Sequence, residues 1–220
     1  MAFVVVGLAS GPARAGCNDS PAAGVDWTQC EKIRLILRGV NLAGARLGGA
    51  DLNGTDLQGA NLSGADMTRA SVDRGRLSGA DLSRAKLVQL NGYRANFSGA
   101  KLVGADLTKA ELLRAIFVGA DLTNATMRKV EMQRANLQGA NLTGANLSGA
   151  DLARVNLTNT RLDGAKLGQA RLERTRLENT DLRPSVGLSQ AQLDAACGDA
   201  KTLIPPSLKA PKTWPCAKED

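Results

Sequence analysis

Apolar residues recur at every fifth position along most of the chain. Leucine or a residue of similar size stands at Leu37, Leu42 and Leu47 and continues to Leu182, giving 30 consecutive pentads in one register. Two positions before most of these large residues stands a small one, usually alanine, as at Ala45. A period of five places successive leucines about 140° apart around an α-helix, and on opposite faces of a straight strand. The chain must therefore bend once in each pentad if the leucines are to share one core.

The residues between the apolar positions have the composition of a turn. In the segment LSGA at 62–65, glycine is third of four, where a type II turn requires a positive φ. Glycine fills the equivalent position in 14 of the 29 pentads between Gly39 and Asn179. Because four right-angled corners close a square, the pattern predicts a four-sided coil of 20 residues.

Two columns of matching residues support this period. One column, which we call the arginine row, consists of Arg74, Arg94, Arg114, Arg134, Arg154 and Arg174. The other consists of Gly39, Gly59, Gly79, Gly99, Gly119, Gly139, Asn159 and Asn179. Glycine and asparagine are the residues that best tolerate positive φ. We interpret each column as one edge of the coil, seen once per turn of the chain.

Pentads such as ANLSGADM and QGANLTGANLSGADL resemble those of the pentapeptide-repeat family. The resemblance covers residues 37–182. It implies an all-β fold, a right-handed quadrilateral β-helix with inward leucine and alanine, here of about 7.5 coils. It implies little about function.

The segments on either side of the repeat predict a leader and two caps. Residues 1–15 have an apolar run and an Ala13-Arg14-Ala15 cleavage pattern, typical of a secretory signal peptide, although no basic residue precedes the run. The alternatives are a frayed tail or, less favoured, a lipoprotein signal. Residues 16–36 and 183–220 are interpreted as N-terminal and C-terminal caps, and we expect a periplasmic or secreted protein. No later segment is long enough to span a membrane.

Four cysteines lie outside the repeat, two at each end: Cys17, Cys30, Cys197 and Cys216. Their even number and flanking positions favour two disulfides in an oxidising compartment. Pairing within each end closes short loops, whereas pairing between the ends would have to span the column. Four buried thiols are the alternative, and the absence of histidine and of CxxC spacing disfavours zinc.

The caps also contain specific apolar signals. At the front, Trp27 and the alternating Ile33, Leu35 and Leu37 can lead into the first coil. At the back, Ser189-Gln190-Ala191-Gln192 matches a capping box. It predicts a short helix at about 190–197, which Gly198 would end and Trp214 would help to cover.

The middle of the repeat departs from the size pattern. Leu90 takes a small site and Gly92 a large one, an exchange that conserves volume and keeps the register. Phe97 and Phe117, 20 residues apart at the large site, should stack.

Tyr93, Leu113 and Ile116 occupy outward positions near the arginine row. Single exposed apolar residues are ordinary, so we favour that interpretation. A patch for a partner protein or a homodimer is the alternative.

Charge limits the choice of partner. The net charge of +7 and the arginine row suit an anionic polymer of the cell envelope or an unidentified protein. Aromatic residues make up only 3% of the chain, which disfavours nucleic acid as the partner because few rings can stack on bases. Glu111, Glu131 and Asp151 each stand three positions before a row arginine, so ion pairs and a simple solvated edge are the favoured explanation of the row.

No catalytic arrangement is visible in the sequence. The chain has no histidine, no phosphate-binding loop and no paired carboxylates, and we expect neither enzymatic activity nor a cofactor or metal. The favoured function is an extracytoplasmic interaction scaffold. The alternative is a cytoplasmic DNA mimic that protects a topoisomerase or inhibits another enzyme, as some relatives implied by the resemblance do; the basic charge and the signal peptide disfavour it.

Overall fold

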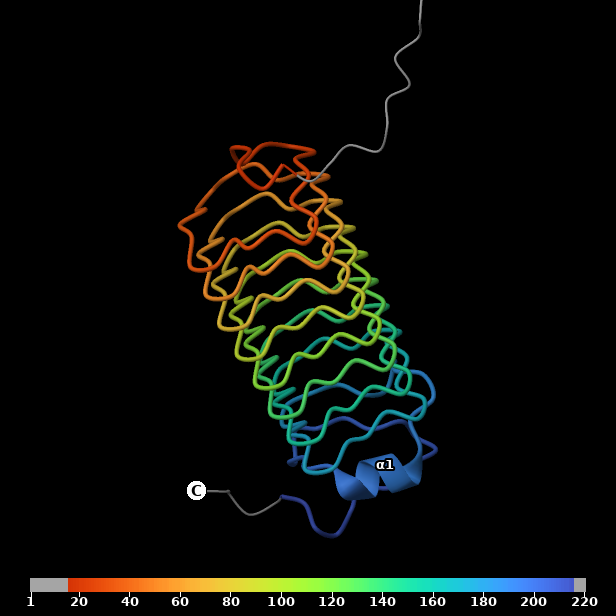
Figure 1. Cartoon of the computed structure of the whole chain (residues 1–220). Coiled ribbons are helices and arrows are strands. Elements are labelled where there is room, and N and C mark those ends of the chain that lie inside the picture. The colour runs from red at the N-terminus through yellow and green to blue at the C-terminus, as the bar shows by residue number, and fades with distance from the viewer. Residues whose placement is uncertain (1–15, 216–220) are drawn as a thin grey trace, which may run out of the picture.

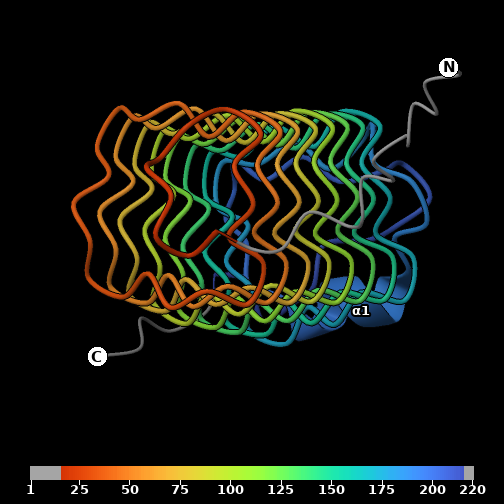
Figure 2. The same cartoon turned by 45° about the horizontal axis from the view of Figure 1, so that its top comes forward.

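The computed structural model describes residues 16–215, which form a single column of stacked coils (Figure 1). Each coil pairs with the next through isolated parallel bridges between residues 20 apart, from Asp26 with Arg46 to Lys166 with Val186. The turned view shows the coils stacked one behind another along the column (Figure 2). At the C-terminal end the interval lengthens, since Arg176 bridges Cys197 and Asp181 bridges Leu203. The bridges begin at Asp26, so the repeat extends further toward the N-terminus than the predicted boundary at Leu37.

One turn closes each pentad, as the glycine pattern predicted. In a representative turn the backbone N–H of Ala45 donates to the carbonyl of Leu42 at 3.0 Å, and the third residue, Gly44, has a φ of 63°. Every third turn residue from Gly39 to Asn179 has a positive φ, whether or not it is glycine. Four turns in each 20-residue bridge interval give the coil its four sides.

The core is a narrow stack of the large and small inward residues. Leu107 and Ala105 are fully buried, as are nearly all their equivalents. The Phe97 and Phe117 rings stack with centroids 4.6 Å apart and planes 6° apart, as predicted. Burial of one leucine-sized side chain stabilises the fold by about 1.5–3 kcal/mol, so each coil contributes through its contacts with its two neighbours.

The register continues through the irregular middle. Asn91 bridges both Ser71 and Glu111, the residues 20 positions before and after it. Leu90 is fully buried at the small site. A Cβ added to Gly92 would lie 2.8 Å from the Leu112 Cδ2, so the smaller residue at 92 leaves room for its neighbours. The large residue at 90 and the small residue at 92 therefore exchange places without a change of register.

The N-terminal end is closed by a disulfide and by a buried lysine. Cys17 and Cys30 are bonded, with their Cα atoms 5.4 Å apart. Lys32 occupies an inward position, where its Nζ donates to the Cys17 carbonyl at 2.6 Å and lies 4.0 Å from the centroid of the buried Trp27 ring. Ile33 follows Lys32 in the turn and is exposed, and Leu35, at the small site before Leu37, is also 39% exposed, so the expected alternation is wrong for these two.

The C-terminal end is covered by helix α1 (Gln190–Ala195), which lies at the blue end of the column in Figure 1. The Ser189 capping box is present, and Leu193 is buried. The Trp214 indole N–H donates to the Ala196 carbonyl at 2.8 Å. Gly198 does not end the helix, which stops at Ala195; instead, a Cβ at 198 would lie 2.4 Å from the Trp214 ring.

Several expectations fall at the limits of the described chain. Cys197 is disulfide-bonded, and Cys216, the other cysteine expected at this end, lies outside the described residues. The predicted signal peptide at 1–15 also lies outside them. Within residues 16–215, no helix has the length and apolar character needed to cross a membrane.

Aspartate and asparagine side chains reinforce the faces of the coil. At the bridge position of many pentads their Oδ1 accepts the backbone N–H two residues later, as Asn61 does from Ser63 at 3.1 Å and Asp81 from Ser83 at 2.9 Å. Hydrogen bonding to the Ser83 side chain and backbone holds the pKa of the Asp81 carboxyl below its usual value. The ionised form of Asp81 is therefore favoured by folding.

This linkage makes Asp81 a contributor to acid sensitivity. A lowered folded-state pKa stabilises the fold above the usual value of about 3.9, and this stabilisation is lost as the pH falls through the lowered pKa. Asp81→Asn keeps the acceptor but cannot titrate, so we expect its urea midpoint to fall less than that of the wild type between about pH 5 and about pH 2. Asp81→Ala should be less stable than Asp81→Asn at both pH values, because alanine cannot accept the hydrogen bond from the Ser83 N–H. Equal acid sensitivity in the wild type and Asp81→Asn would contradict this assignment.

Candidate functional site

The arginine row lies at one corner of the column. Each member is the third residue of its turn and has a φ between 55° and 58°, except Arg134 at 60°. The column also contains Arg34 (φ 55°), which the sequence pattern missed because Gly54 interrupts the steps of 20. Near Gly54 a surface depression of about 290 Å³ is lined by residues that include Arg34 and Arg74.

The row has no ion pairs over most of its length. Among the described residues, no carboxylate oxygen lies within 4.0 Å of the charged nitrogens of Arg74, Arg94, Arg114, Arg134 or Arg154, and all five residues are exposed. The expected pairs with Glu111, Glu131 and Asp151 do not form. Asp151 instead accepts from Arg171 Nη1 at 2.7 Å, in the coil that follows it. Asp151 also accepts from Gln133 Nε2 in the coil before it, so its partners lie in neighbouring coils and spacing along the chain alone does not produce a contact.

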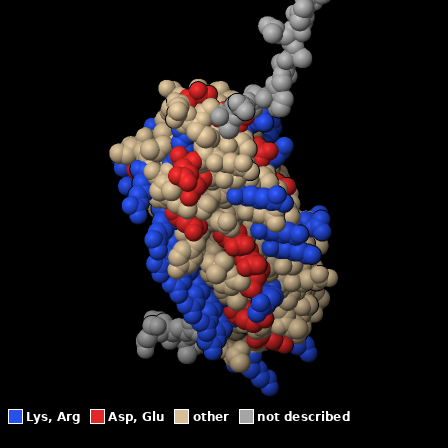
Figure 3. Space-filling view, in the orientation of Figure 1, with Lys and Arg blue, Asp and Glu red and all other residues tan. Residues whose placement is uncertain are grey.

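Opposite charges are therefore separated into parallel bands. Figure 3 shows a continuous basic ridge along one edge of the column and an acidic band on the face beside it. Glu111, Glu131 and Asp151 are joined by successive bridges, so the acids form their own column. From Arg74 to Arg154, the described surface presents a line of cations without a carboxylate in direct contact.

A row of this kind is unfavourable for the fold. A non-glycine residue in the left-handed region costs roughly 1–2 kcal/mol relative to a relaxed conformation. Stacked arginines about 4.8 Å apart along the column also repel one another. The six glycines of the glycine column, at another corner, show that the same turn forms without either effect. Non-glycine residues such as Arg84 and Lys109 have the same conformation at other corners, so the unbroken line of exposed arginines is what makes the row the strongest candidate for a functional site.

The predicted apolar strip is divided by the arginine row. Tyr93 and Leu113 are half-buried in the turn, on the side of the acidic face, whereas Ile116 lies on the next face and is 38% exposed. Arg94 lies over the Tyr93 ring, with its Cζ 5.1 Å from the centroid. The sequence did not single out Val118, which is 37% exposed two residues after Ile116. The three residues therefore do not form one continuous dimer patch.

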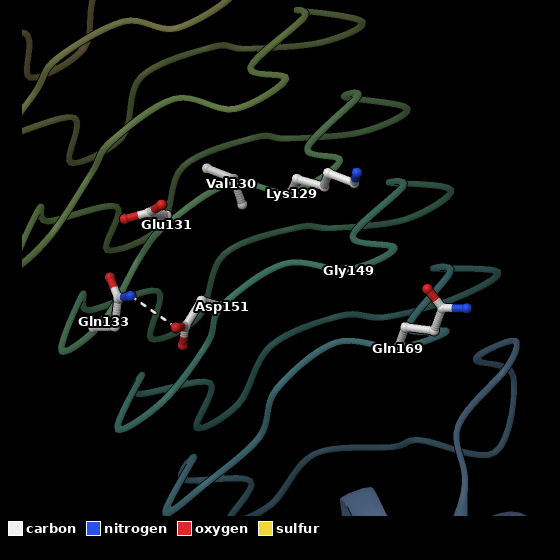
Figure 4. A pocket seen from close by; sticks show the side chains of 7 residues that line it. All are labelled: Lys129, Val130, Glu131, Gln133, Gly149, Asp151 and Gln169. Atoms are coloured by element: carbon white, nitrogen blue, oxygen red, sulfur yellow. Dashed lines mark hydrogen bonds between the residues drawn. The ribbon is translucent and has the colours of Figure 1, made fainter.

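A second depression, of about 430 Å³, lies on the acidic face and is lined by residues that include Glu131 and Asp151 (Figure 4). Two of its side chains are joined by a hydrogen bond, in which Gln133 Nε2 donates to Asp151 Oδ2 at 2.8 Å. The Gln133 Oε1 is buried without a partner in the part of the chain that the structure describes. No group of three or more histidine, cysteine or acidic residues there could hold a metal ion. We find no catalytic arrangement in this depression.

Comparisons with known proteins agree with the geometry. A family model described as pentapeptide repeats matches the chain in eight copies. The matched ranges, which partly overlap, are 36–72, 76–112, 93–128, 114–144 and 131–169. No curated protein sequence matches the chain.

Solved structures with the same architecture include two with named roles. HetL, from the cyanobacterium Nostoc sp. strain PCC 7120, is a pentapeptide-repeat protein involved in heterocyst differentiation regulation. HetL is 25% identical in sequence to this chain, with a TM-score of 0.60, and the match covers 83% of this chain and 87% of the HetL chain. QnrB1, a plasmid-mediated fluoroquinolone resistance protein, is 17% identical with a TM-score of 0.42, over 83% and 92% of the two chains. The likeness to HetL implies that the column is a right-handed β-helix.

The unfavourable character of the row can be measured. We expect Arg114→Gly to raise the free energy of unfolding by about 0.5–1 kcal/mol, because glycine relieves the left-handed conformation at a smaller entropic cost. Removal of repulsion from Arg94 and Arg134 should add a further gain that is larger in about 0.01 M salt than in about 1 M salt.

Arg84→Gly is the matched control, because Arg84 has the same conformation but stacks between Gly64 and Gly104. The increase in the free energy of unfolding caused by Arg84→Gly should not depend on the salt concentration. Destabilisation by Arg114→Gly, with Arg84→Gly stabilising, would show that the row contributes to the fold and is not merely tolerated.

Proposed function

The chain belongs to the pentapeptide-repeat family, and on that basis we propose that it is a non-enzymatic scaffold whose arginine row binds a negatively charged partner outside the cytoplasm. The observation that carries the proposal is the line of exposed arginines, in left-handed conformations and without ion pairs over most of its length. A protein surface or a polymer of the cell envelope would supply the opposite charge.

The composition supports a role in binding. The chain has no histidine, and its outward aspartates hydrogen-bond to their own turns, as Asp106 does with the Thr108 N–H at 3.0 Å. These carboxylates stabilise the faces of the coil. A rigid column with regularly spaced side chains suits recognition of an extended partner.

The disulfides support an extracytoplasmic location. Cys17–Cys30 closes the N-terminal end, and Cys197 is also disulfide-bonded. Disulfides persist in oxidising compartments such as the periplasm and the extracellular space.

Charge argues against the alternative of a cytoplasmic DNA mimic that protects a topoisomerase or inhibits another enzyme. Such a mimic requires an acidic surface that resembles phosphates, whereas this chain has a net charge of +7 and an edge of arginines. The fluoroquinolone resistance named for QnrB1 belongs to a protein whose likeness is too distant to carry over.

The compartment can be tested on protein isolated from its native source. We expect the purified protein to begin at Gly16 and to show no free thiol when denatured without reductant, because export would remove residues 1–15 and permit both disulfides. N-terminal sequencing and thiol titration measure these outcomes. An intact Met1 together with four reactive thiols would refute the extracytoplasmic proposal.

The role of the row is tested by partner recovery. Wild-type protein immobilised on beads should recover at least one component from an envelope extract, and Arg94→Glu/Arg114→Glu should recover it at least tenfold less, because charge reversal repels an anion. Arg84→Glu/Lys109→Glu makes the same change at two other corners and should behave as the wild type. Equal recovery of every component by the wild type and the row variant would remove the row as a binding site.

A further inference from the structure

The face beyond the arginine row carries no charge over several coils. It lies between the row and the glycine column, and its outward residues from 78 to 158 are Ser78, Asn96, Ser98, Ile116, Val118, Asn136, Gln138, Asn156 and Thr158. We call these nine residues the amide face. Each of the other three faces has charged outward residues, for example Asp81 and Lys101, within the same coils. The amide face is therefore the long uncharged side of the column and is bordered by cations.

The amide groups of this face are oriented by the backbone. Asn96, Asn136 and Asn156 each accept the backbone N–H two residues later through Oδ1, at 2.9, 3.1 and 3.0 Å. Because Oδ1 must be the acceptor, each Nδ2 is directed elsewhere. None of these three Nδ2 groups has a hydrogen-bond partner among the described residues. The face thus offers a line of free N–H donors parallel to the donors of the arginine row.

The centre of the amide face is apolar. Ile116 bridges Asn96 and Asn136 and is 38% exposed, and Val118 beside it is 37% exposed. Side chains that donate hydrogen bonds therefore surround a small apolar contact area. A ligand for this face must have many acceptor oxygens, negative charge along one side and some C–H surface.

We propose that the amide face and the arginine row together bind an acidic polysaccharide, with the chain of sugar rings lying along the column. The proposal rests on the proposed function and names the partner of the same row. Uronic acid carboxylates would pair with the row arginines, and ring and hydroxyl oxygens would accept from the asparagine amides. The C–H face of one sugar ring would pack on Ile116 and Val118.

Other polyanions fit this surface less well. Polyphosphate has no apolar surface to place on Ile116. Nucleic acid would find few aromatic rings for stacking, since Tyr93 is the only tyrosine in the chain. An extended acidic peptide repeats about every 3.3 Å per residue, or about 6.6 Å between side chains on one side, whereas the row and the amides repeat once per coil, about every 4.8 Å. A repeating polymer matches a repeating surface.

The test measures binding of polygalacturonate and alginate, with dextran as the neutral control and polyglutamate as the acidic-peptide control. The wild type should bind at least one of the two uronates and not dextran, with lower affinity at higher salt. Asn136→Asp/Asn156→Asp keeps each Oδ1 acceptor and replaces the free N–H donors by carboxylate oxygens. Since aspartate already occupies this position at Asp81 and Asp106, the variant should fold, and it should bind at least tenfold more weakly.

Matched controls separate this site from net charge. Asn41→Asp/Asn146→Asp makes the same chemical change on other faces. Arg94→Gln/Arg114→Gln removes two row charges, and Arg84→Gln/Lys109→Gln removes two at other corners; glutamine is present at the same turn position in Gln29, Gln89 and Gln169. Asn41→Asp/Asn146→Asp and Arg84→Gln/Lys109→Gln should bind the uronate with an affinity within twofold of that of the wild type. Arg94→Gln/Arg114→Gln should bind it at least tenfold more weakly.

Three outcomes would overturn the proposal: failure to bind either uronate, equal weakening by the face variant and its control, or binding of polyglutamate as tight as that of the uronates. If row-dependent recovery of an envelope component persists in any of these cases, the proposed function survives without the polysaccharide. If Arg94→Gln/Arg114→Gln binds the uronates as tightly as the wild type does, and Arg94→Glu/Arg114→Glu recovers every envelope component as well as the wild type does, both proposals fail.

Discussion

The structure depends on the backbone hydrogen bonds that join each coil to the next. Leu107 N–H donates to the Thr126 carbonyl at 2.7 Å, and Asp106 N–H donates to the Ala85 carbonyl at 3.0 Å, so each pentad is fixed between the coils before and after it. These bonds set the interval of 20 residues. Core stacking, the turn columns and the surface bands all follow from this interval, and one inserted residue would displace every column after it.

The repeat could be predicted from sequence because each pentad contains its own signal. Leu42 and Gly44 together indicate an inward side chain and a turn, and the structure confirms both. The ends could not be predicted as well. Lys32 occupies an inward site that the pattern reserves for apolar residues, because a carbonyl and the Trp27 ring at the end of the column can receive its ammonium group.

The alignment of the candidate site was predictable, whereas its contacts were not. The turn geometry places Arg94 and Arg114 in equivalent positions at one corner, as their spacing indicated. Whether Glu111 would reach Arg114 depends on the direction of each side chain from the turn, which sequence separation does not give. The amide face was missed because its members differ in residue type, as Ile116 does from Asn136, so no single residue type repeats without a break at steps of 20.

Basic and acidic side chains also lie at different distances from the axis of the column, because basic residues occupy the left-handed turn positions and acidic residues do not. Apart from glycine, the described positions contain only arginine, lysine, glutamine and asparagine, and no acid. Many aspartates, such as Asp56, lie instead at the centres of faces and are at least half-buried. The corners of a square lie farther from its axis than the centres of its sides. A negatively charged molecule that reaches the surface therefore contacts the cationic side chains of the corners before it reaches the aspartates at the centres of the faces, so the layering favours anions at short range.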